Sequence, residues 1–215
     1  ELSSFPFDLK KMGISGALFD LVKLNDVSKN IIGNFSAEKL YNEAVLWTER
    51  YDKEYFKILS NEKEKCLEYL GIGRGGKKPR KDIGKLSELK DFWAFMHNDL
   101  YDENLFLPEK ICSFDACSIL ERYIGLYNEE DDNTEWFEKV KSLCEPFGYA
   151  SNMKEYKANP ESFKGHVGDV STVIRIAITG RCDTPDLCSI MKILGKDEVL
   201  SRLSRAVKFY GGIND

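Results

Sequence analysis

Apolar residues recur at every third or fourth position along most of this chain, and this spacing constrains the fold more than any other feature. The segment 184–195, "TPDLCSIMKILG", shows the pattern most clearly. Thr184 and Pro185 are typical of a helix start, and Gly195 is typical of a helix end. The apolar face of this helix is predicted to consist of Leu187, Ile190, Met191 and Leu194. Because no strands alternate with the helical segments, we predict an all-α protein.

One stretch departs from this pattern. Residues 170–178, "VSTVIRIAI", are rich in β-branched side chains, which favour strands. No partner strand is predicted nearby, so a buried helix is the better interpretation. Phe114 and Phe137 are expected on the buried faces of two further helices. The starts of four helices are assigned to Ser36, Ser87, Thr134 and Thr184.

The composition limits the class of protein. The chain has 215 residues, of which 42% are hydrophobic, so it can bury the core of one large domain or two small ones. No apolar run approaches the roughly 18 residues of a membrane span, and the N-terminus does not resemble a signal peptide. The chain begins without an initiator Met, and we therefore expect a fragment of a longer protein.

The cysteines and histidines do not predict a metal site. None of the six cysteines forms a C-x-x-C pair, and His97 and His166 are far apart in the sequence. Zinc sites need closely spaced ligands. We expect reduced thiols and a cytoplasmic protein with no metal.

Charge is distributed unevenly along the chain. The net charge of −5 argues against a uniformly basic nucleic-acid-binding protein. The range 72–81 nevertheless carries five cations and no acid: Arg74, Lys77, Lys78, Arg80 and Lys81. This basic segment is either a local RNA contact or a solvated surface loop.

The same segment resembles a phosphate-binding motif. Gly71, Gly73 and Gly76 fit G-x-G-x-x-G, and residues 71–77 nearly fit the P-loop. Both motifs require a preceding strand, but residues 61–70 have a helical pattern, and Lys78 replaces the required Ser or Thr. We therefore predict a basic connection between helices. No Ser–His–acid or Cys–His set is visible, so no catalytic residue is predicted.

Residues 174–209 carry three motifs in a specific order. These are "IRIAITG" at 174–180, "TPDL" at 184–187 and "LGK" at 194–196 followed by Arg202-Leu203. The stretch resembles the C-terminal anticodon-binding region of bacterial-type glutamyl-tRNA synthetases, a class I family. Weaker likenesses at 7–32 and 78–92 extend the resemblance over nearly the whole chain. Residues 11–15, "KMGIS", lack the second lysine of the K-M-S-K-S loop of class I enzymes, so no ATP chemistry is predicted here.

The resemblance implies two helical subdomains that form a cage around the anticodon loop. We expect a remnant of the stem-contact or connecting segment at 1–30, one subdomain at 31–127 and a second at 128–215. The acidic run from Asn128 to Asn133 marks the boundary between the subdomains.

The resemblance also implies an activity for the parent enzyme. That enzyme would attach glutamate to tRNA(Glu), with tRNA(Gln) as an alternative, and would use ATP and Mg. The fragment alone would be inactive and hold no cofactor, and neither DNA nor a membrane is an expected partner.

By motif position, the resemblance implies that Arg175, Thr184, Pro185 and Leu187 contact the anticodon bases. Their chemistry agrees, because unpaired bases are recognised by stacking and by hydrogen bonds to their edges. Arg175 offers a planar guanidinium, Thr184 offers a hydroxyl, and Pro185 and Leu187 offer apolar surface. The alternative is that Thr184 and Pro185 only begin a helix and that Arg175 pairs with an acid.

A departure from the family pattern concerns the third anticodon base. An arginine of the family helps to read it, but an ungapped match to "KLSEL" at 85–89 places Asp82 at that position. We assign the role to the nearby Arg80. The expected contacts with the tRNA backbone are Arg74, Lys77, Lys78 and Lys81. Two rival functions are a helical protein–protein interaction module and a nucleotide-binding protein that uses residues 71–78.

Overall fold

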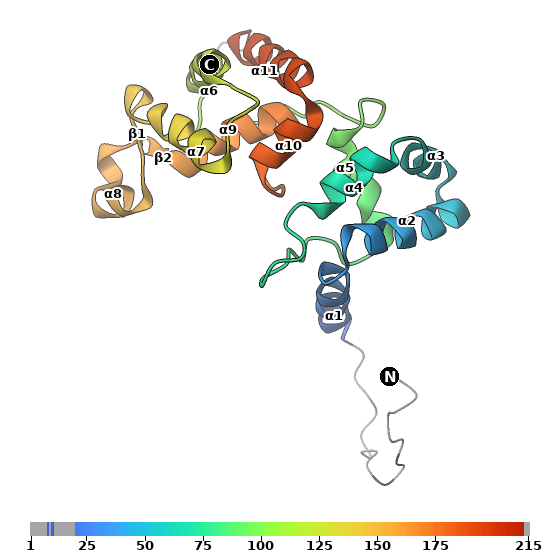
Figure 1. Ribbon diagram of the computed structural model, residues 1–215. Coiled ribbons are helices and arrows are strands. Elements are labelled where there is room, and N and C mark those ends of the chain that lie inside the picture. The colour runs from blue at the N-terminus through green and yellow to red at the C-terminus, as the bar shows by residue number, and fades with distance from the viewer. Residues whose placement is uncertain (1–7, 9, 11–19, 213–215) are drawn as a thin grey trace.

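The computed structural model describes residues 8, 10 and 20–212. The regular secondary structure of this part of the chain is almost entirely helical, as predicted, with one parallel pair of two-residue strands (Figure 1). The segment 11–15, with 7, 9 and the rest of 11–19 from the range 7–32, lies outside the described residues. The α-helices are α1 (Leu21–Gly33), α2 (Ala37–Tyr51), α3 (Lys53–Asn61), α4 (Lys63–Gly71), α5 (Leu89–Trp93), α6 (Ser113–Leu126), α7 (Asn133–Ser142), α8 (Met153–Ala158), α9 (Val167–Thr179), α10 (Leu187–Leu194) and α11 (Lys196–Gly211). The 3-10 helices are η3 (Leu86–Glu88), η4 (Ala94–Met96), η5 (Glu145–Phe147) and η6 (Pro160–Ser162), and the strands are β1 (Tyr149–Ala150) and β2 (Gly165–His166).

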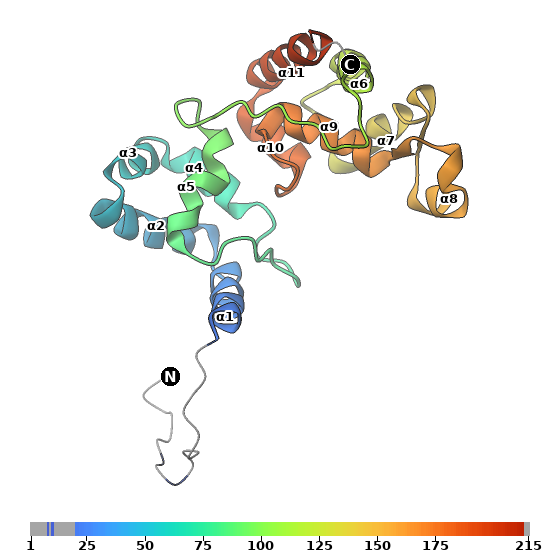
Figure 2. The ribbon, with the colours of Figure 1, turned by 180° about the vertical axis from the view of Figure 1, so that it is seen from behind.

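The helices form two groups that lie at an angle to each other (Figures 1 and 2). In the first group α2 packs on α3 and α4, and in the second α6 packs on α11 and α9. α10 contacts α4 and so joins the groups. Packing thus places α6, which precedes residue 128, with the helices that follow it. The division into subdomains at residue 128 stays a prediction.

The segment rich in β-branched residues is a buried helix, as we predicted. α9 contacts α6, α7 and α11, so apolar side chains are buried around most of its circumference. A helix that is covered on several sides needs no polar face, which explains the continuous apolar run. Gly180 ends α9 with a φ of 67°, and a Cβ there would lie 3.2 Å from the carbonyl oxygen of Asp102. The chain therefore turns sharply at this point toward residues 181–186.

Ser36 begins α2 as predicted, but the prediction of Thr134 as the start of α7 was wrong. Asp132 caps α7 instead, because one of its carboxylate oxygens accepts hydrogen bonds from the amides of Thr134 and Glu135 at 2.7 and 2.8 Å. The Glu135 carboxylate accepts the amide of Asp132 in return, at 3.0 Å. A carboxylate can accept from two free amides at once and favours the positive end of the helix, so it displaces the nearby hydroxyl.

The predicted starts at Thr184 and Ser87 were wrong for a similar reason. Asp186 begins α10, and its carboxylate accepts the Ser189 amide at 2.8 Å. Near Ser87 the first helical turn is 3-10, and the Glu88 carboxylate accepts the Gly84 amide at 2.9 Å. Thr184 is thereby released from helix capping and is available for another role.

Buried His97 lies in a chain of hydrogen bonds inside the first group. Its Nδ1 lies 3.1 Å from a carboxylate oxygen of Glu62, and its Nε2 lies 3.1 Å from the hydroxyl of Tyr69. An ionised carboxylate only accepts, so Nδ1 carries the proton and Nε2 accepts from the tyrosine. The Tyr69 hydroxyl also approaches the hydroxyl of Tyr55, at 3.3 Å. These contacts use both ring nitrogens of a neutral imidazole.

Folding stability is expected to fall between pH 7.5 and pH 5.5, partly because of His97. Burial lowers the pKa of His97, and the opposing charge of Glu62 raises it by less. The unfolded chain therefore binds a proton more readily, and stability is lost as the pH falls below the usual histidine value of about 6.5. Urea unfolding at both pH values should show a smaller difference for His97→Gln than for the wild type. An equal difference would mean that His97 does not contribute to the pH dependence.

Candidate nucleic-acid interface

Arg175, Thr184 and Pro185 lie together, as their predicted roles require. Arg175 is on α9, and the turn at Gly180 brings the chain back past its guanidinium. Its Nη1 donates to the carbonyl oxygen of Pro185 at 3.0 Å and to the hydroxyl of Thr184. This group of three residues is called the arginine–threonine site below.

The Arg175 guanidinium has free hydrogen-bonding capacity. It forms no ion pair with any described residue, and in this part of the chain only its Nη1 has hydrogen-bond partners. Burial lowers its pKa, and the positive charge of Arg80 adds to this effect, while Asp186 and Asp183 oppose it. The alternative that Arg175 pairs with an acid therefore does not describe this structure. Its Nε and Nη2 remain available to a ligand that accepts hydrogen bonds.

Thr184 is only 7% exposed, and two further predicted base contacts are also buried. Leu187 is only 1% exposed and packs in the core as the first residue of α10. Pro185 is also buried. The apolar surface expected from these two side chains is therefore not exposed in this structure, and they support the loop from beneath instead.

Thr184 and Arg175 open onto a surface hollow of about 450 Å³. It lies between α7, α8, the first turns of α9 and residues 182–184. Two of its walls are the apolar side chains of Phe137 and Met153, which are 37% and 43% exposed. Our prediction that Phe137 is buried was wrong, because Trp136 and Val140 occupy the buried face of α7. The sequence signal was a second aromatic residue directly after Trp136, which one helical face could not bury as well.

Arg80 lies on the loop between α4 and η3, near enough to Arg175 for the two charges to interact. Its Nε and Nη2 donate to the two carboxylate oxygens of Asp82 at 2.6 and 2.9 Å. The acid at the position of the family arginine therefore forms a two-pronged ion pair with the arginine assigned in its place. The two helical groups each contribute one arginine to this region.

The basic segment is an irregular loop and not a phosphate cradle. α4 ends at Gly71, and Gly73 and Gly75 have φ values of 72° and 74°. A Cβ on Gly73 would lie 2.7 Å from the Arg80 side chain, so the glycine lets that side chain pack across the loop. After Gly71 the next α-helix begins only at Leu89, so these glycines do not lead directly into a helix as both phosphate motifs require.

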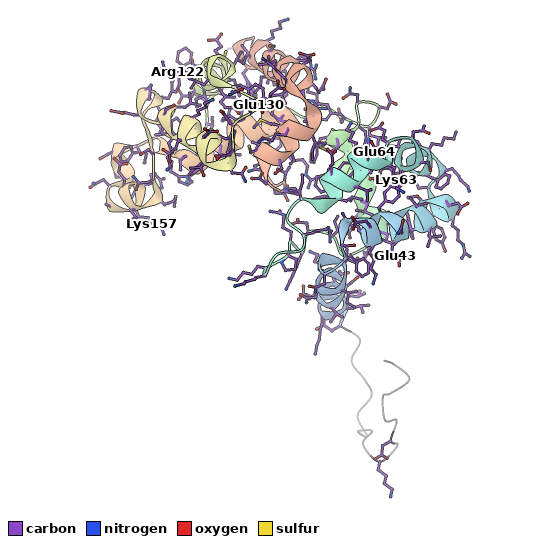
Figure 3. All side chains as sticks on the ribbon, viewed as in Figure 1. Glu43, Lys63, Glu64, Arg122, Glu130 and Lys157 are labelled. Carbon is purple, nitrogen blue, oxygen red and sulfur yellow. The ribbon has the colours of Figure 1, made fainter. Side chains whose placement is uncertain are left out.

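The five cations of this segment differ in their contacts. Arg74 points inward, and its Nη1 donates to the carbonyl oxygen of Ile32 at 2.6 Å, at the end of α1. Burial lowers its pKa. Lys77, Lys78 and Lys81 are exposed, and the loop that carries them projects away from the helices (Figure 3). These three lysines fit a phosphate contact better than Arg74 does.

The described residues give no sign of other chemistry. None of the described helices is both long and apolar enough to cross a membrane. Across residues 20–212, no three His, Cys, Asp or Glu side chains gather as metal ligands would. All six cysteines are free thiols. The interface therefore offers cations, hydrogen-bond donors and apolar surface.

Comparison with known protein families agrees with this arrangement. The model of a family described as "Anticodon binding domain" matches residues 79–207. The match includes Arg80, Phe137, Arg175 and Thr184, and therefore spans both helical groups.

Several curated proteins are similar to this chain. A "Glutamate--tRNA ligase" of Acetivibrio thermocellus is 42% identical over 205 residues, which cover 95% of this chain and 38% of that protein. A protein of the same name from Sorangium cellulosum is 38% identical over 94% of this chain and 36% of its own length. Another, from Clostridium perfringens strain 13, is 38% identical over 93% of this chain. The chain spans little more than a third of the length of these relatives.

Proposed function

The chain belongs to the anticodon binding domain family, and on that premise we propose that it holds the anticodon loop of a tRNA. The observation that carries the proposal is the arginine–threonine site. It combines a guanidinium that has no acidic partner among the described residues with a surface hollow beside it. Unpaired loop bases can be splayed out and bound by such donors and by apolar surface.

The proposal extends to the whole protein. The chain is the anticodon-binding part of a glutamate–tRNA ligase, in keeping with the names of its relatives. The whole protein uses ATP and Mg to attach glutamate to tRNA. The chain described here selects and orients the tRNA and does not perform that chemistry.

The tRNA partner is one with a glutamate anticodon, and tRNA(Gln) is the alternative that shares most of it. The third anticodon base separates the two, and Arg80 is the residue that we assign to it. Because Asp82 already holds the Arg80 guanidinium, a base must either replace this carboxylate or bind to the donors that it leaves free. Reading of this base therefore depends on both residues.

Replacing Arg175 with alanine is expected to weaken binding to the anticodon stem-loop of tRNA(Glu) by about 1–3 kcal/mol, the contribution of one base stack or one forked contact. Fluorescence titration with labelled RNA measures this. The matched control is Arg122→Ala, an exposed arginine of α6 outside the hollow (Figure 3).

Two outcomes decide the assignment. Equal affinity of the wild type and Arg175→Ala, with both folded, would remove Arg175 from the RNA site. Failure of the wild type to bind any anticodon stem-loop, at low salt and high protein concentration, would favour a protein–protein interaction module instead.

A further inference from the structure

We propose that the hollow beside the arginine–threonine site binds one unstacked base of the same RNA loop, with the ring of Phe137 as its stacking platform. This base is a neighbour of the one that Arg175 contacts. The inference rests on the proposed function, and it adds a second base-binding position that the three sequence motifs do not contain.

The exposure of Phe137 is not explained by folding. α7 already anchors to the core through Trp136, whose indole Nε1 donates to the Tyr123 hydroxyl at 2.9 Å, and through the buried Val140. Phe137 follows on an adjacent face and projects into the hollow. An isolated exposed aromatic side chain is ordinary, but this one shares its hollow with a second exposed apolar side chain, Met153. Two exposed apolar side chains from different helices therefore line the same hollow, and the flat ring of Phe137 offers a surface for stacking.

The hollow also has polar groups where the edges of a base would lie. Arg175 contributes its Nε and Nη2, which have no partner in the part of the chain that the structure describes. The hydroxyl of Ser171, one helical turn earlier on α9, has no hydrogen-bond partner within the described residues. Thr184 and Asp183 complete this side. Apolar walls combined with donors and acceptors on one side are the usual features of a nucleobase pocket.

The electrostatics around Phe137 favour a nucleotide over an uncharged aromatic ligand. The Lys141 ammonium lies over the Phe137 ring, 5.0 Å from its centroid, which places a positive charge against one face of the ring and leaves the other face for a base. A phosphate attached to the stacked base would approach this ammonium. The lysine also pairs with Glu138 at 2.6 Å, and both side chains are partly exposed, so the ammonium can turn toward RNA at small cost.

The hollow adjoins the proposed anticodon contact, so a base bound in the hollow belongs to the same RNA. Arg175 and Thr184 line both the proposed anticodon contact and this hollow. A base bound in the hollow is therefore within one or two nucleotides of the base at Arg175. Stacking on an aromatic ring tolerates any base, so we expect a contribution to affinity and not to sequence selection.

The test compares Phe137→Ala with Phe114→Ala in the full chain, with RNA stem-loops as the probe. Our prediction that Phe114 is buried was wrong, because it is 74% exposed on α6; since it also lies outside the hollow, it is a matched control. We expect Phe137→Ala to weaken RNA binding about tenfold and Phe114→Ala to leave it unchanged. Phe137→Tyr keeps an aromatic ring and should bind with the affinity of the wild type. Circular dichroism checks that each variant is folded.

A second measurement identifies the base. Each loop nucleotide is replaced in turn by an abasic one. At one position, the abasic substitution should weaken binding to the wild type about tenfold. The same substitution should weaken binding to Phe137→Ala very little, because this variant has already lost the stacking contact with that base. Additive losses at every position would overturn the proposal.

The outcomes separate this inference from the proposed function. If Phe137→Ala binds like Phe114→Ala while Arg175→Ala binds weakly, the base platform is refuted and the anticodon-binding function stands. If the wild type does not bind the stem-loop, the proposed function itself fails, and the base platform fails with it.

Discussion

Replacing Arg202 with methionine is expected to lower the free energy of unfolding by roughly 3–5 kcal/mol, the usual cost of removing one partner from a buried charged network. Methionine fills a similar space, so the loss comes from hydrogen bonds and charge and not from a cavity. Arg202 is the most deeply buried charged side chain of the described residues. It lies on α11, between the two helical groups.

The contacts of Arg202 explain the size of this effect. Its Nη1 donates to the carbonyl oxygens of Phe95 and Ile178, at 2.8 and 2.7 Å, near the ends of η4 and α9. Its Nε donates to Glu198 at 2.6 Å, and its guanidinium lies 3.9 Å from the centroid of the Tyr101 ring. Carbonyls at helix ends lack intrahelical partners, and buried ones cost about 1–3 kcal/mol each when left unpaired. The Arg202 side chain thus provides hydrogen bonds to buried carbonyl oxygens of both helical groups.

Urea unfolding of Arg202→Met beside Arg205→Met measures the effect. Arg205 lies one turn further along α11, where its Nε donates to Glu103 at 2.7 Å, but its side chain is 42% exposed. Water screens that pair, so its loss should cost less than about 1 kcal/mol. Similar losses in the two variants would mean that the buried network does not stabilise the fold as we infer.

Reversing the charge of Lys77, Lys78 and Lys81 to glutamate is expected to reduce tRNA affinity at low salt by roughly a hundredfold or more. The slope of log affinity against log salt should become less steep by roughly two to three units, because three phosphates no longer release their counterions. The three lysines are exposed on the loop between α4 and η3, and contacts to phosphate carry no sequence information. The affinity for every tRNA should therefore fall by about the same factor.

A filter-binding salt series with tRNA(Glu) and an unrelated tRNA measures both quantities. The control is the same reversal at Lys53, Lys57 and Lys63, which are exposed on α3 and α4; Lys63 lies on the far side of the first group from the loop (Figure 3). If the affinity falls for tRNA(Glu) alone, the loop contacts bases and not only phosphates. If the slope of log affinity against log salt does not change, the loop does not contact the RNA.

The helical class and most core positions could be predicted because they depend on local spacing. The stripe of α10 and the buried helix α9 were both predicted correctly from the positions of their apolar residues. Helix starts were less predictable. Hydroxyl and carboxylate side chains compete for the same free amides. At α7 and α10 the N-cap is an aspartate that lies two residues from the predicted threonine.

The candidate site was predicted in part. The motifs named Arg175 and Thr184, and the structure brings them into contact. They could not reveal that Leu187 faces the core, or that Phe137 and Met153 face the hollow, because the burial of each side chain depends on how the helices pack. Nor did Arg74 differ in sequence from its neighbouring cations, although it binds the end of α1.

The sequence by itself determined that this chain is helical and which short segments resemble an anticodon-binding region, since helix periodicity and motif spacing are local properties. Only the tertiary structure decided which cations are free, which aromatic ring is exposed, and how the two helical groups are joined. Those features depend on contacts between residues far apart in the chain. Arg202 is the clearest case, because its partners at Phe95 and Ile178 are 107 and 24 residues away.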